Sequence, residues 1–264
     1  MNVSLVIPAY NEAANLRKCL DSVATQTIKP FEVIIVDNNS TDGTADLASS
    51  YPFTKVIKES VQGRVYARDA GFNKAKGDVI ARVDADTVLP DNWIKYITTF
   101  YESLAHQKSA FTGDADFHNV RFPKAVSWLY RQMSFNLNHL LIGHPTLWGS
   151  NMAITRNQWE DVKALVCQRN DIHEDLDLSI HIKEAGNQIV YDHNCHVKAE
   201  LRRVYSDRHE LFEYLQWWPR TLKSHGKLMW PVCWLISVVP LYCLTLVLIA
   251  ADKIARLSGK KSLA

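Results

Sequence analysis

The N-terminal part of the chain alternates between short apolar runs and amphipathic stretches, and this alternation constrains the fold most strongly. The apolar runs are residues 2–9, 31–36, 54–58 and 79–83, and the helical stretches between them are residues 12–24, 44–50 and 63–75. Within residues 12–24, apolar side chains recur at helical spacing, at Leu16, Cys19, Leu20 and Val23. Strands and helices that alternate at this spacing predict a parallel sheet with right-handed crossovers.

The last of these apolar runs, residues 79–83, is followed by two carboxylates, Asp84 and Asp86. In open α/β sheets, ligands bind in the crevice beyond the carboxyl ends of the strands. Carboxylate oxygens at that position suit a hard divalent cation, which commonly brings substrate phosphates with it. The simpler interpretation is that both aspartates only solvate the end of a strand, because Asp-x-Asp is a short and common pattern.

Polar side chains also follow the first two predicted strands. Tyr10 and Glu12 come after the first strand, and Asp37 comes after the second. Polar groups that converge from three strand ends suit a nucleotide, through base stacking, ribose hydroxyls and a metal-bridged diphosphate. Neither Gly-x-Gly-x-x-Gly nor Gly-x-x-x-x-Gly-Lys-Ser/Thr follows the first strand, which argues against a dinucleotide-binding fold and a P-loop.

Composition excludes several classes of protein. Of the 264 residues, 47% are hydrophobic and the net charge is only +2, so we expect a globular protein without nucleic acid as a partner. The five cysteines are odd in number and show no Cys-x-x-Cys spacing, which favours reduced, buried thiols in a cytosolic protein. The N-terminus has the pattern of a strand and not that of a signal peptide.

The second half of the chain is predicted to be mixed. We expect helices at residues 92–104, 122–141, 156–166, 172–184 and 208–224, and strands at residues 110–115, 188–191 and 196–201. A loop, Gly149-Ser150-Asn151, leads into a further strand. Glu174, Asp175 and Asp177 lie at the start of a helix, where the helix dipole alone would favour carboxylates.

Residues 228–251 contain no charged side chain and are long enough to span a bilayer. Pro231 and Pro240 interrupt this stretch, and basic residues flank it on both sides. One full span therefore competes with a re-entrant or interfacial hairpin. In either arrangement, we expect this C-terminal segment to attach the protein to a membrane.

Five motifs taken together resemble family 2 glycosyltransferases of the GT-A fold, over roughly residues 2–214. They are Ile7-Pro8-Ala9-Tyr10-Asn11-Glu12, Val36-Asp37-Asn38-Asn39-Ser40-Thr41-Asp42-Gly43-Thr44, Gly63-Arg64-Val65-Tyr66-Ala67-Arg68-Asp69-Ala70-Gly71, Val83-Asp84-Ala85-Asp86-Thr87 and His173-Glu174-Asp175. The resemblance implies an α/β fold with a mostly parallel sheet flanked by helices. It also implies a catalytic domain over residues 1–225, made of a Rossmann-like nucleotide-sugar-binding half (1–115) and an acceptor half (116–225). A hydrophobic, membrane-associated segment with a basic tail (226–264) would follow.

The resemblance implies a role for each donor-side residue. Asp37 would hydrogen-bond the nucleobase, usually uracil, and Arg68 would hold the loop or the diphosphate. Asp84 would lie in the ribose and metal shell. The base and ribose pocket would be lined by Pro8, Ala9, Tyr10 and Glu12.

The remaining implied roles concern the metal and the acceptor. Asp86 would bind Mn²⁺ or Mg²⁺ bridging the diphosphate, and His196 is either a third metal ligand or a structural histidine. Asp175 would be the general base that deprotonates the acceptor hydroxyl, with Glu174 beside it. The loop Gly149-Ser150-Asn151 would face the acceptor. Such an arrangement suits inverting transfer, which needs a base on the acceptor side and an electrophile at the leaving diphosphate.

One departure from the family pattern narrows the expected activity. Processive relatives carry Gln-x-x-Arg-Trp, whereas here Gln216 and Arg220 are separated by three residues and Thr221 follows. The sequence therefore predicts transfer of a single sugar, from a UDP-sugar in the first instance, to a lipid-linked or cell-envelope acceptor at the cytosolic membrane face. Two alternatives stay open: a nucleotidyltransferase, and a catalytically silent sugar-nucleotide-binding or scaffold protein.

Overall fold

The computed structural model describes residues 1–120, 122–201, 208–240, 242–243 and 246. Its centre is one sheet with the strand order β3-β2-β1-β4-β6-β5-β7. In that order the strands are Thr54–Lys58, Glu32–Asp37, Val3–Ala9, Val79–Arg82, Met152–Thr155, Ser109–Phe117 and Gln188–Ala199. All neighbouring pairs are parallel except those that include β6, which runs antiparallel to both β4 and β5. The predicted mostly parallel α/β sheet is confirmed.

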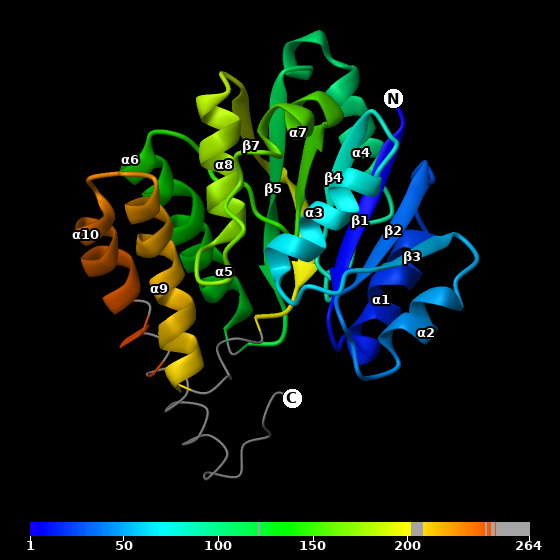
Figure 1. The fold of residues 1–264 in the computed structure, drawn as a ribbon, viewed down its shortest axis with the longest axis horizontal. Helices are drawn as coiled ribbons and strands as arrows, with labels where there is room; N and C mark the ends of the chain where they lie inside the picture. The colour runs from blue at the N-terminus through cyan, green and yellow to red at the C-terminus, as the bar shows by residue number, and fades with distance from the viewer. Residues whose placement is uncertain (121, 202–207, 241, 244–245, 247–264) are drawn as a thin grey trace.

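Helices cover both faces of this sheet (Figure 1). The helices of the first half are α1 (Ala13–Ala24), α2 (Thr44–Ser49), α3 (Arg64–Lys74) and α4 (Trp93–Glu102). Those of the second half are α5 (Pro123–Arg131), α6 (Asn138–Ile142), α7 (Arg156–Val162), α8 (Glu174–Glu184), α9 (Arg208–Ser224) and α10 (Trp230–Cys233).

The period-2 alternation of the strands divides the apolar core into two layers. In β1, Leu5 and Ile7 pack in a cluster with side chains of α1 and α4, whereas Val6 packs in a second cluster with side chains of α3, α7 and α8. Successive side chains of a strand point to opposite faces, so a fully apolar strand such as β1 serves both layers. A third, smaller cluster, which includes Leu176, joins α6, α8, α9 and α10 beside the sheet.

Two elements differ from the sequence-based expectation. The strands predicted at 188–191 and 196–201 form one strand, β7, whose pairing with β5 shifts register between Thr112 and Asp114. The helix predicted at 122–141 is α5 and α6 joined by a π-helical segment, Gln132–Leu137. In both elements the regular hydrogen bonding is interrupted, by the register shift between β5 and β7 and by the π-helical segment between α5 and α6. Apolar periodicity does not reveal interruptions of this kind.

The C-terminal apolar stretch includes α10, the π-helical segment Trp234–Val238 and the helical residues 239–240, whereas residues 241 and 244–245 lie outside the described part of the chain. Within the described part of the chain, no helix combines the length and the apolar character that crossing a membrane requires. The expectation of a spanning helix is therefore not supported. Residues 247–251 of the predicted segment, and the basic tail that follows, lie outside the described residues. The boundaries at residues 115 and 225 stay predictions.

Candidate active site

A cleft of about 570 Å³ opens beyond the carboxyl ends of the parallel strands. It brings together three groups of predicted residues that are far apart in sequence. The described side chains predicted to form the site and found in its lining are Pro8, Ala9, Tyr10, Glu12, Asp84, Asp86, Ser150, Glu174 and Asp175. The reversed strand β6 begins at this same edge, so the loop before it faces the ends of the parallel strands. Both halves of the chain therefore contribute to one cavity.

Arg82, the last residue of β4, is the centre of the charged groups in this cleft. Its Nη1 donates to Oδ1 of Asp175 at 2.7 Å, and its Nη2 donates to Oδ1 of Asp84 at 3.1 Å and lies 3.4 Å from Oε1 of Glu174. Only 3% of Arg82 is exposed to solvent. Carboxylates surround it, and they hold its pKa above the usual range against the effect of burial. Sequence analysis missed Arg82, although a lone charged residue in an apolar strand is a visible signal.

Asp175 is held by two elements besides β4. Its Oδ2 accepts a hydrogen bond from the backbone N–H of Gly149 at 2.8 Å, and α8 carries it at its first turn. Burial raises the pKa of Asp175, Arg82 opposes that rise, and the nearby charges of Glu174 and Asp84 add to it. A buried carboxylate with a raised pKa and fixed orientation has the properties of a general base.

Glu174 has the opposite electrostatic balance. Burial opposes its charge, but Arg64 and then Arg82 outweigh burial and lower the pKa of Glu174. Nη2 of Arg64 lies 3.5 Å from Oε2 of Glu174, and its guanidinium stacks 4.2 Å from the ring centre of Trp217. The pKa values of these two neighbouring carboxylates therefore differ: Glu174 stays ionised, whereas Asp175 accepts a proton more readily.

Asp84 and Asp86 lie where a cation could bind. Asp84 is held by Arg82 and by the hydroxyl of Ser150, which donates to Oδ2, and 40% of its side chain stays exposed. The charges of Asp86 and Asp84 also act on the buried thiol of Cys19, after burial itself, to raise its pKa above the usual range. Both carboxylates therefore lie at one end of the cleft. Oxygen donors alone in that position fit Mn²⁺ or Mg²⁺.

Loop residues after β1 and β2 also line the cleft. The ring of Tyr10 is 49% exposed and lies at the surface of the cleft. Asn38, which sequence analysis missed, also lines the cleft and ties two loops together. Its amide nitrogen donates to the carbonyls of Glu59 and Val61, and its oxygen accepts from the N–H of Gly63 at 2.8 Å.

Three predicted site residues do not line the cleft. Asp37 is buried, and its Oδ1 accepts from the N–H of Ser40 at 3.2 Å. Arg68 is fully buried and donates to Asp69 and to the carbonyl of Glu174. Arg68 was predicted to hold the loop or the diphosphate, and here it contacts the backbone at the start of α8.

His196 is the third of these residues, and its prediction as a ligand of the Asp86 metal does not fit the structure. Its Nδ1 lies 3.5 Å from Oδ2 of Asp116 on β5, and it is not part of the cleft lining. Val197 and Ala199 pack in the core layer beneath the cleft. Because side chains alternate along a strand, His196 points to the other face of the sheet.

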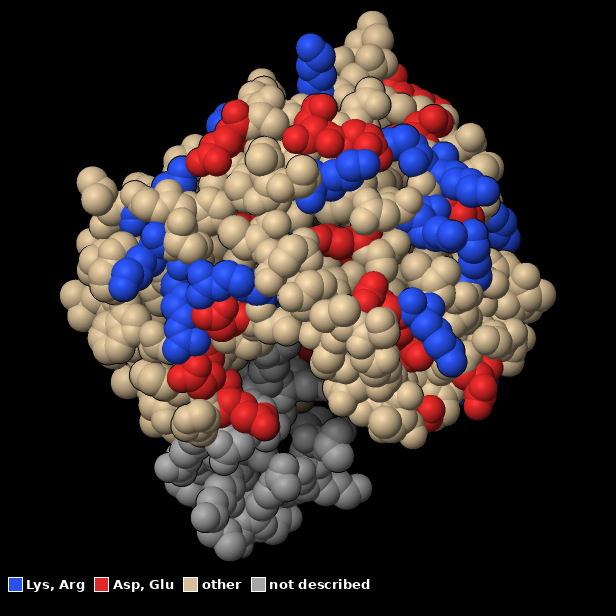
Figure 2. Space-filling view, viewed as in Figure 1, with Lys and Arg blue, Asp and Glu red and all other residues tan. Residues whose placement is uncertain are grey.

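Aromatic side chains also line the cleft. They are Phe117, Tyr130, Trp148 and Tyr214. Phe117 contacts Tyr130 edge-on at 4.8 Å between ring centres, and Tyr130 lies 5.9 Å from Trp148. Over the face seen in Figure 2, the described Lys and Arg side chains are interspersed with Asp and Glu. The cleft therefore offers apolar faces beside the charged groups around Arg82.

Comparisons with known proteins bear on the family. The profile of glycosyl transferase family 2 matches residues 4–162. Glycosyltransferase AglE of Haloferax volcanii is 36% identical over 100 residues, which is 35% of this chain and 33% of that protein. The undecaprenyl-phosphate 4-deoxy-4-formamido-L-arabinose transferase of Serratia proteamaculans is 31% identical over 148 residues, covering 53% of this chain and 43% of that one. The chain thus matches less than half the length of these relatives.

Solved structures show the same fold. The mannosyltransferase PcManGT of Pyrobaculum calidifontis, in complex with GDP-Man and Mn²⁺, superposes with a TM-score of 0.67 at 18% identity, over 97% of this chain and 75% of that one. Residues 1–349 of S. aureus TarS, in complex with UDP-GlcNAc, superpose with a TM-score of 0.61 at 19% identity, over 82% and 65%. The sheet and its flanking helices are therefore GT-A-like.

Proposed function

Because this chain belongs to glycosyl transferase family 2 and is a glycosyltransferase, we propose that it moves one sugar, with inversion, from a nucleotide donor to an acceptor hydroxyl. The observation that carries this proposal is the position of Asp175. Its carboxylate, with a raised pKa, shares one cleft with the two strand-end carboxylates, and Arg82 links it to Asp84. A base and a diphosphate site in one cleft are what inverting transfer requires.

The donor would lie across the ends of β1 and β4. The exposed ring of Tyr10 offers a stacking surface for the base, and Pro8, Ala9 and Glu12 complete the wall of that pocket. A UDP-sugar is the first candidate, and a GDP-sugar is the second, since one structural neighbour holds each class of donor. Asp37 has one oxygen occupied by Ser40, so its other oxygen is the one that would accept from a base.

A divalent metal ion fits beside the diphosphate. Asp86, with Asp84 beside it, would hold Mn²⁺ or Mg²⁺, and a bound ion supplies positive charge that stabilises the leaving nucleoside diphosphate. The neighbour PcManGT was solved with Mn²⁺, which supports this assignment. Ser150 and Arg82 orient Asp84 in the same position.

Asp175 would then act on the acceptor. The acceptor hydroxyl gives its proton to Asp175 as its oxygen bonds to the sugar C1 carbon, and the bond from C1 to the diphosphate oxygen breaks. Attack from the side opposite the leaving group inverts the configuration at C1. The N–H of Gly149 and the guanidinium of Arg82 fix the Asp175 carboxylate for this step. Glu174, held ionised by Arg64, keeps Arg82 positioned.

We place the acceptor at a membrane surface, at the cytosolic face. Helix α9 contributes Tyr214 to the cleft and leads into an exposed apolar surface that consists of Leu228, Met229, Trp230, Val232, Trp234 and Leu235. Leu228 is 91% exposed and Leu235 is 64% exposed. A short helix with such a surface suits a segment that lies in the interface of a bilayer. One relative is named for an undecaprenyl-phosphate substrate, which supports a lipid-linked acceptor.

The donor site is tested by calorimetry with UDP and GDP, with and without Mn²⁺, on the wild type and on Asp86→Ala. We expect binding that needs Mn²⁺ and weakens at least tenfold in Asp86→Ala, whereas Asp161→Ala, an exposed carboxylate on α7, binds as the wild type does. Metal-independent binding that is unchanged in Asp86→Ala would contradict the metal assignment.

Product analysis then separates the candidate activities. With the preferred sugar nucleotide and a glycan or lipid-linked glycan acceptor, which supplies the hydroxyl, a glycosyltransferase releases nucleoside diphosphate. Release of pyrophosphate from a nucleoside triphosphate and a sugar phosphate would instead show a nucleotidyltransferase. Donor binding without transfer or hydrolysis would favour a silent binding protein.

Membrane attachment is tested by flotation with anionic phospholipid vesicles. We expect the full chain to float with the vesicles and Leu228→Glu/Leu235→Glu to stay behind. Leu104→Glu, at a leucine that is 83% exposed in the 3₁₀ turn Leu104–His106 after α4, is the control. Equal flotation of the wild type and the double variant would remove this surface as the site of attachment.

A further inference from the structure

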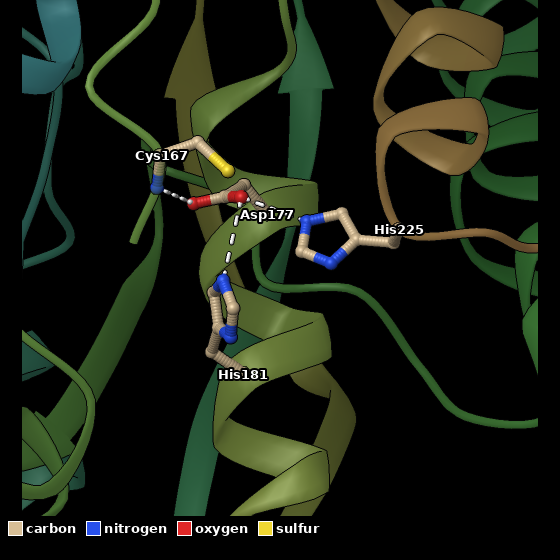
Figure 3. Close-up of side chains that lie close together, drawn as sticks. All are labelled: Cys167, Asp177, His181 and His225. Carbon is tan, nitrogen blue, oxygen red and sulfur yellow. Dashed lines mark hydrogen bonds and ion pairs between the residues drawn. The ribbon is translucent and has the colours of Figure 1, made fainter. Parts of the chain in front are cut away.

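A second cluster of polar side chains lies on α8, away from the cleft. It consists of Cys167, Asp177, His181 and His225 (Figure 3). Asp177 and His181 are one helical turn apart on α8, Cys167 comes from the loop that precedes α8, and His225 follows the end of α9. None of these four side chains lines the cleft.

The potential ligand atoms of this cluster converge. One nitrogen, sulfur or oxygen atom from each residue lies within 4.8 Å of every other. Nε2 of His225 is 2.8 Å from Oδ1 of Asp177, and Nε2 of His181 is 3.7 Å from the same oxygen. The ligand atoms of a tetrahedral zinc site are about 3.3–3.8 Å apart. Movements of about 1 Å in these side-chain atoms would therefore bring them to the spacing of a tetrahedral zinc site.

A separate observation is that one buried nitrogen atom of the cluster has no hydrogen-bond partner. Nε2 of His181 is buried and forms no hydrogen bond. A buried polar atom without a partner is costly, and each such atom calls for an explanation. The nearest acceptor, Oδ1 of Asp177, already pairs with His225. A cation placed among the four side chains would satisfy this nitrogen.

The groups around the cluster are arranged as supporting contacts of a metal site. Oδ2 of Asp177 accepts from the backbone N–H of Cys167 at 3.0 Å, which leaves Oδ1 directed at the two histidines. Nδ1 of His181 lies 3.9 Å from Oε2 of Glu184. In metal sites, the second ring nitrogen of a histidine ligand commonly faces a carboxylate or a carbonyl, which fixes the ligating nitrogen.

We propose that Cys167, Asp177, His181 and His225 form a structural zinc site. One thiolate, two imidazoles and one carboxylate suit Zn²⁺, which accepts sulfur, nitrogen and oxygen ligands in tetrahedral geometry. Binding releases the thiol proton of Cys167 to solvent, and the sulfur then ligates the metal. Four protein ligands leave no open position, so the ion supports the fold and takes no substrate.

Such an ion would connect three elements around the proposed general base. It would join the loop before α8, the first turns of α8 and the end of α9. Asp175 lies two residues before Asp177, and α9 carries Tyr214 of the cleft lining. This consequence rests on the proposed role of Asp175, whereas zinc binding itself does not.

The test uses the full chain with Asp86→Ala as background, so that metal at the donor site does not contribute. We expect close to one Zn²⁺ per chain by elemental analysis after gel filtration, and a melting temperature about 5 °C higher at a hundredfold excess over Kd. Substituting Co²⁺ should give a thiolate-to-cobalt charge-transfer band and the visible bands of tetrahedral cobalt. Only a site that contains cysteine gives the charge-transfer band.

Substitutions then identify the ligands. Cys167→Ser should abolish the charge-transfer band, and His225→Ala should weaken zinc binding at least tenfold. The matched controls are Cys243→Ser and His139→Ala, which change an exposed thiol and an exposed imidazole outside the cluster. A wild-type chain that binds neither Zn²⁺ nor Co²⁺ at micromolar concentration, or a cobalt spectrum unchanged in Cys167→Ser, would overturn the proposal. Because these spectra need no turnover, a failure of the glycosyltransferase mechanism leaves this test intact.

Discussion

Helix α8 takes part in two polar clusters that are built in opposite ways. At its first turn, the fixed cation Arg82 lies among the carboxylates of Asp84, Glu174 and Asp175. Half a turn further on, the single carboxylate of Asp177 lies among a thiol and two imidazoles, with no lysine or arginine within salt-bridge distance among the described contacts. The first cluster contains a permanent cation that offsets part of its negative charge. The second depends on protons or on a bound ion.

The largest effect should come from Asp175→Asn. The amide has nearly the shape of the carboxylate but cannot accept the acceptor proton, so we expect kcat to fall by about 10³-fold. Donor affinity measured by calorimetry should change less than threefold. Asp171→Asn, on the exposed loop before α8, is the control and should keep wild-type turnover. A turnover number for Asp175→Asn within tenfold of the wild type would rule out Asp175 as the base.

The next effect tests the charge balance of the first cluster. Arg82→Met fills a similar volume but leaves buried carboxylates without their cation. Breaking a buried ion pair on one side is strongly destabilising, so we expect a loss of about 3 kcal/mol in the free energy of unfolding, measured by urea denaturation. Arg156→Met, at a partly buried arginine whose guanidinium donates to the carbonyl of Gly77, should lose less than half as much.

The second cluster should respond differently to the same chemical change used at Asp175. Asp177→Asn leaves one oxygen where the carboxylate has two, so it cannot pair with His225 and accept from the N–H of Cys167 through oxygen at once. We expect a loss of about 2 kcal/mol in the free energy of unfolding, because a buried network loses its charge-assisted hydrogen bonds. The folded fraction should keep wild-type donor affinity. A tenfold loss of donor affinity with unchanged stability would show that the two clusters are not separate.

The smallest effect concerns pH. Because the pKa of Asp175 is raised above the ordinary aspartate range, by burial in the first place, the group becomes protonated at a higher pH than a free aspartate. A base must be ionised to act, so kcat/KM should fall tenfold per pH unit below that pKa and level off above it. The acid limb should lie above about pH 4, the region of an unperturbed aspartate. A profile that is flat from pH 5 to 8, under conditions where the chain is folded, would contradict a raised pKa.

The fold and most of the cleft were predictable because they depend on local signals. Apolar periodicity located β1, β2 and β4, and parallel strands bring their carboxyl ends to one edge, which placed Tyr10, Asp84 and Asp86 together. Arg82 was missed because its role depends on Glu174 and Asp175, which are 92 and 93 residues away. The residues next to Arg82 in the sequence give no indication that Glu174 and Asp175 are its partners.

Two other outcomes show where local patterns stop being informative. The resemblance offered His196 as either a metal ligand or a structural histidine, and the sequence alone left both open. The face that its side chain takes depends on β7 being one continuous strand with a register shift against β5. Asp177 and His181 have a visible helical spacing. Their proximity to Cys167 and His225 depends on how α9 packs against α8, which the sequence does not state.

The reversed direction of β6 has a consequence for how this enzyme could diversify. If β6 ran parallel to its neighbours, its beginning would lie at the opposite edge of the sheet from the cleft. Because it runs antiparallel, the segment from Gly143 to Asn151 arrives at the cleft before the strand starts, and Gly149 packs against Arg82. Most of that segment is buried, and Asn151 hydrogen-bonds Trp93 and the carbonyls of Asp114 and Cys195. Trp148 is only partly buried and lines the cleft, so it is the position in this segment where a substitution would change the cleft with least disturbance of the core.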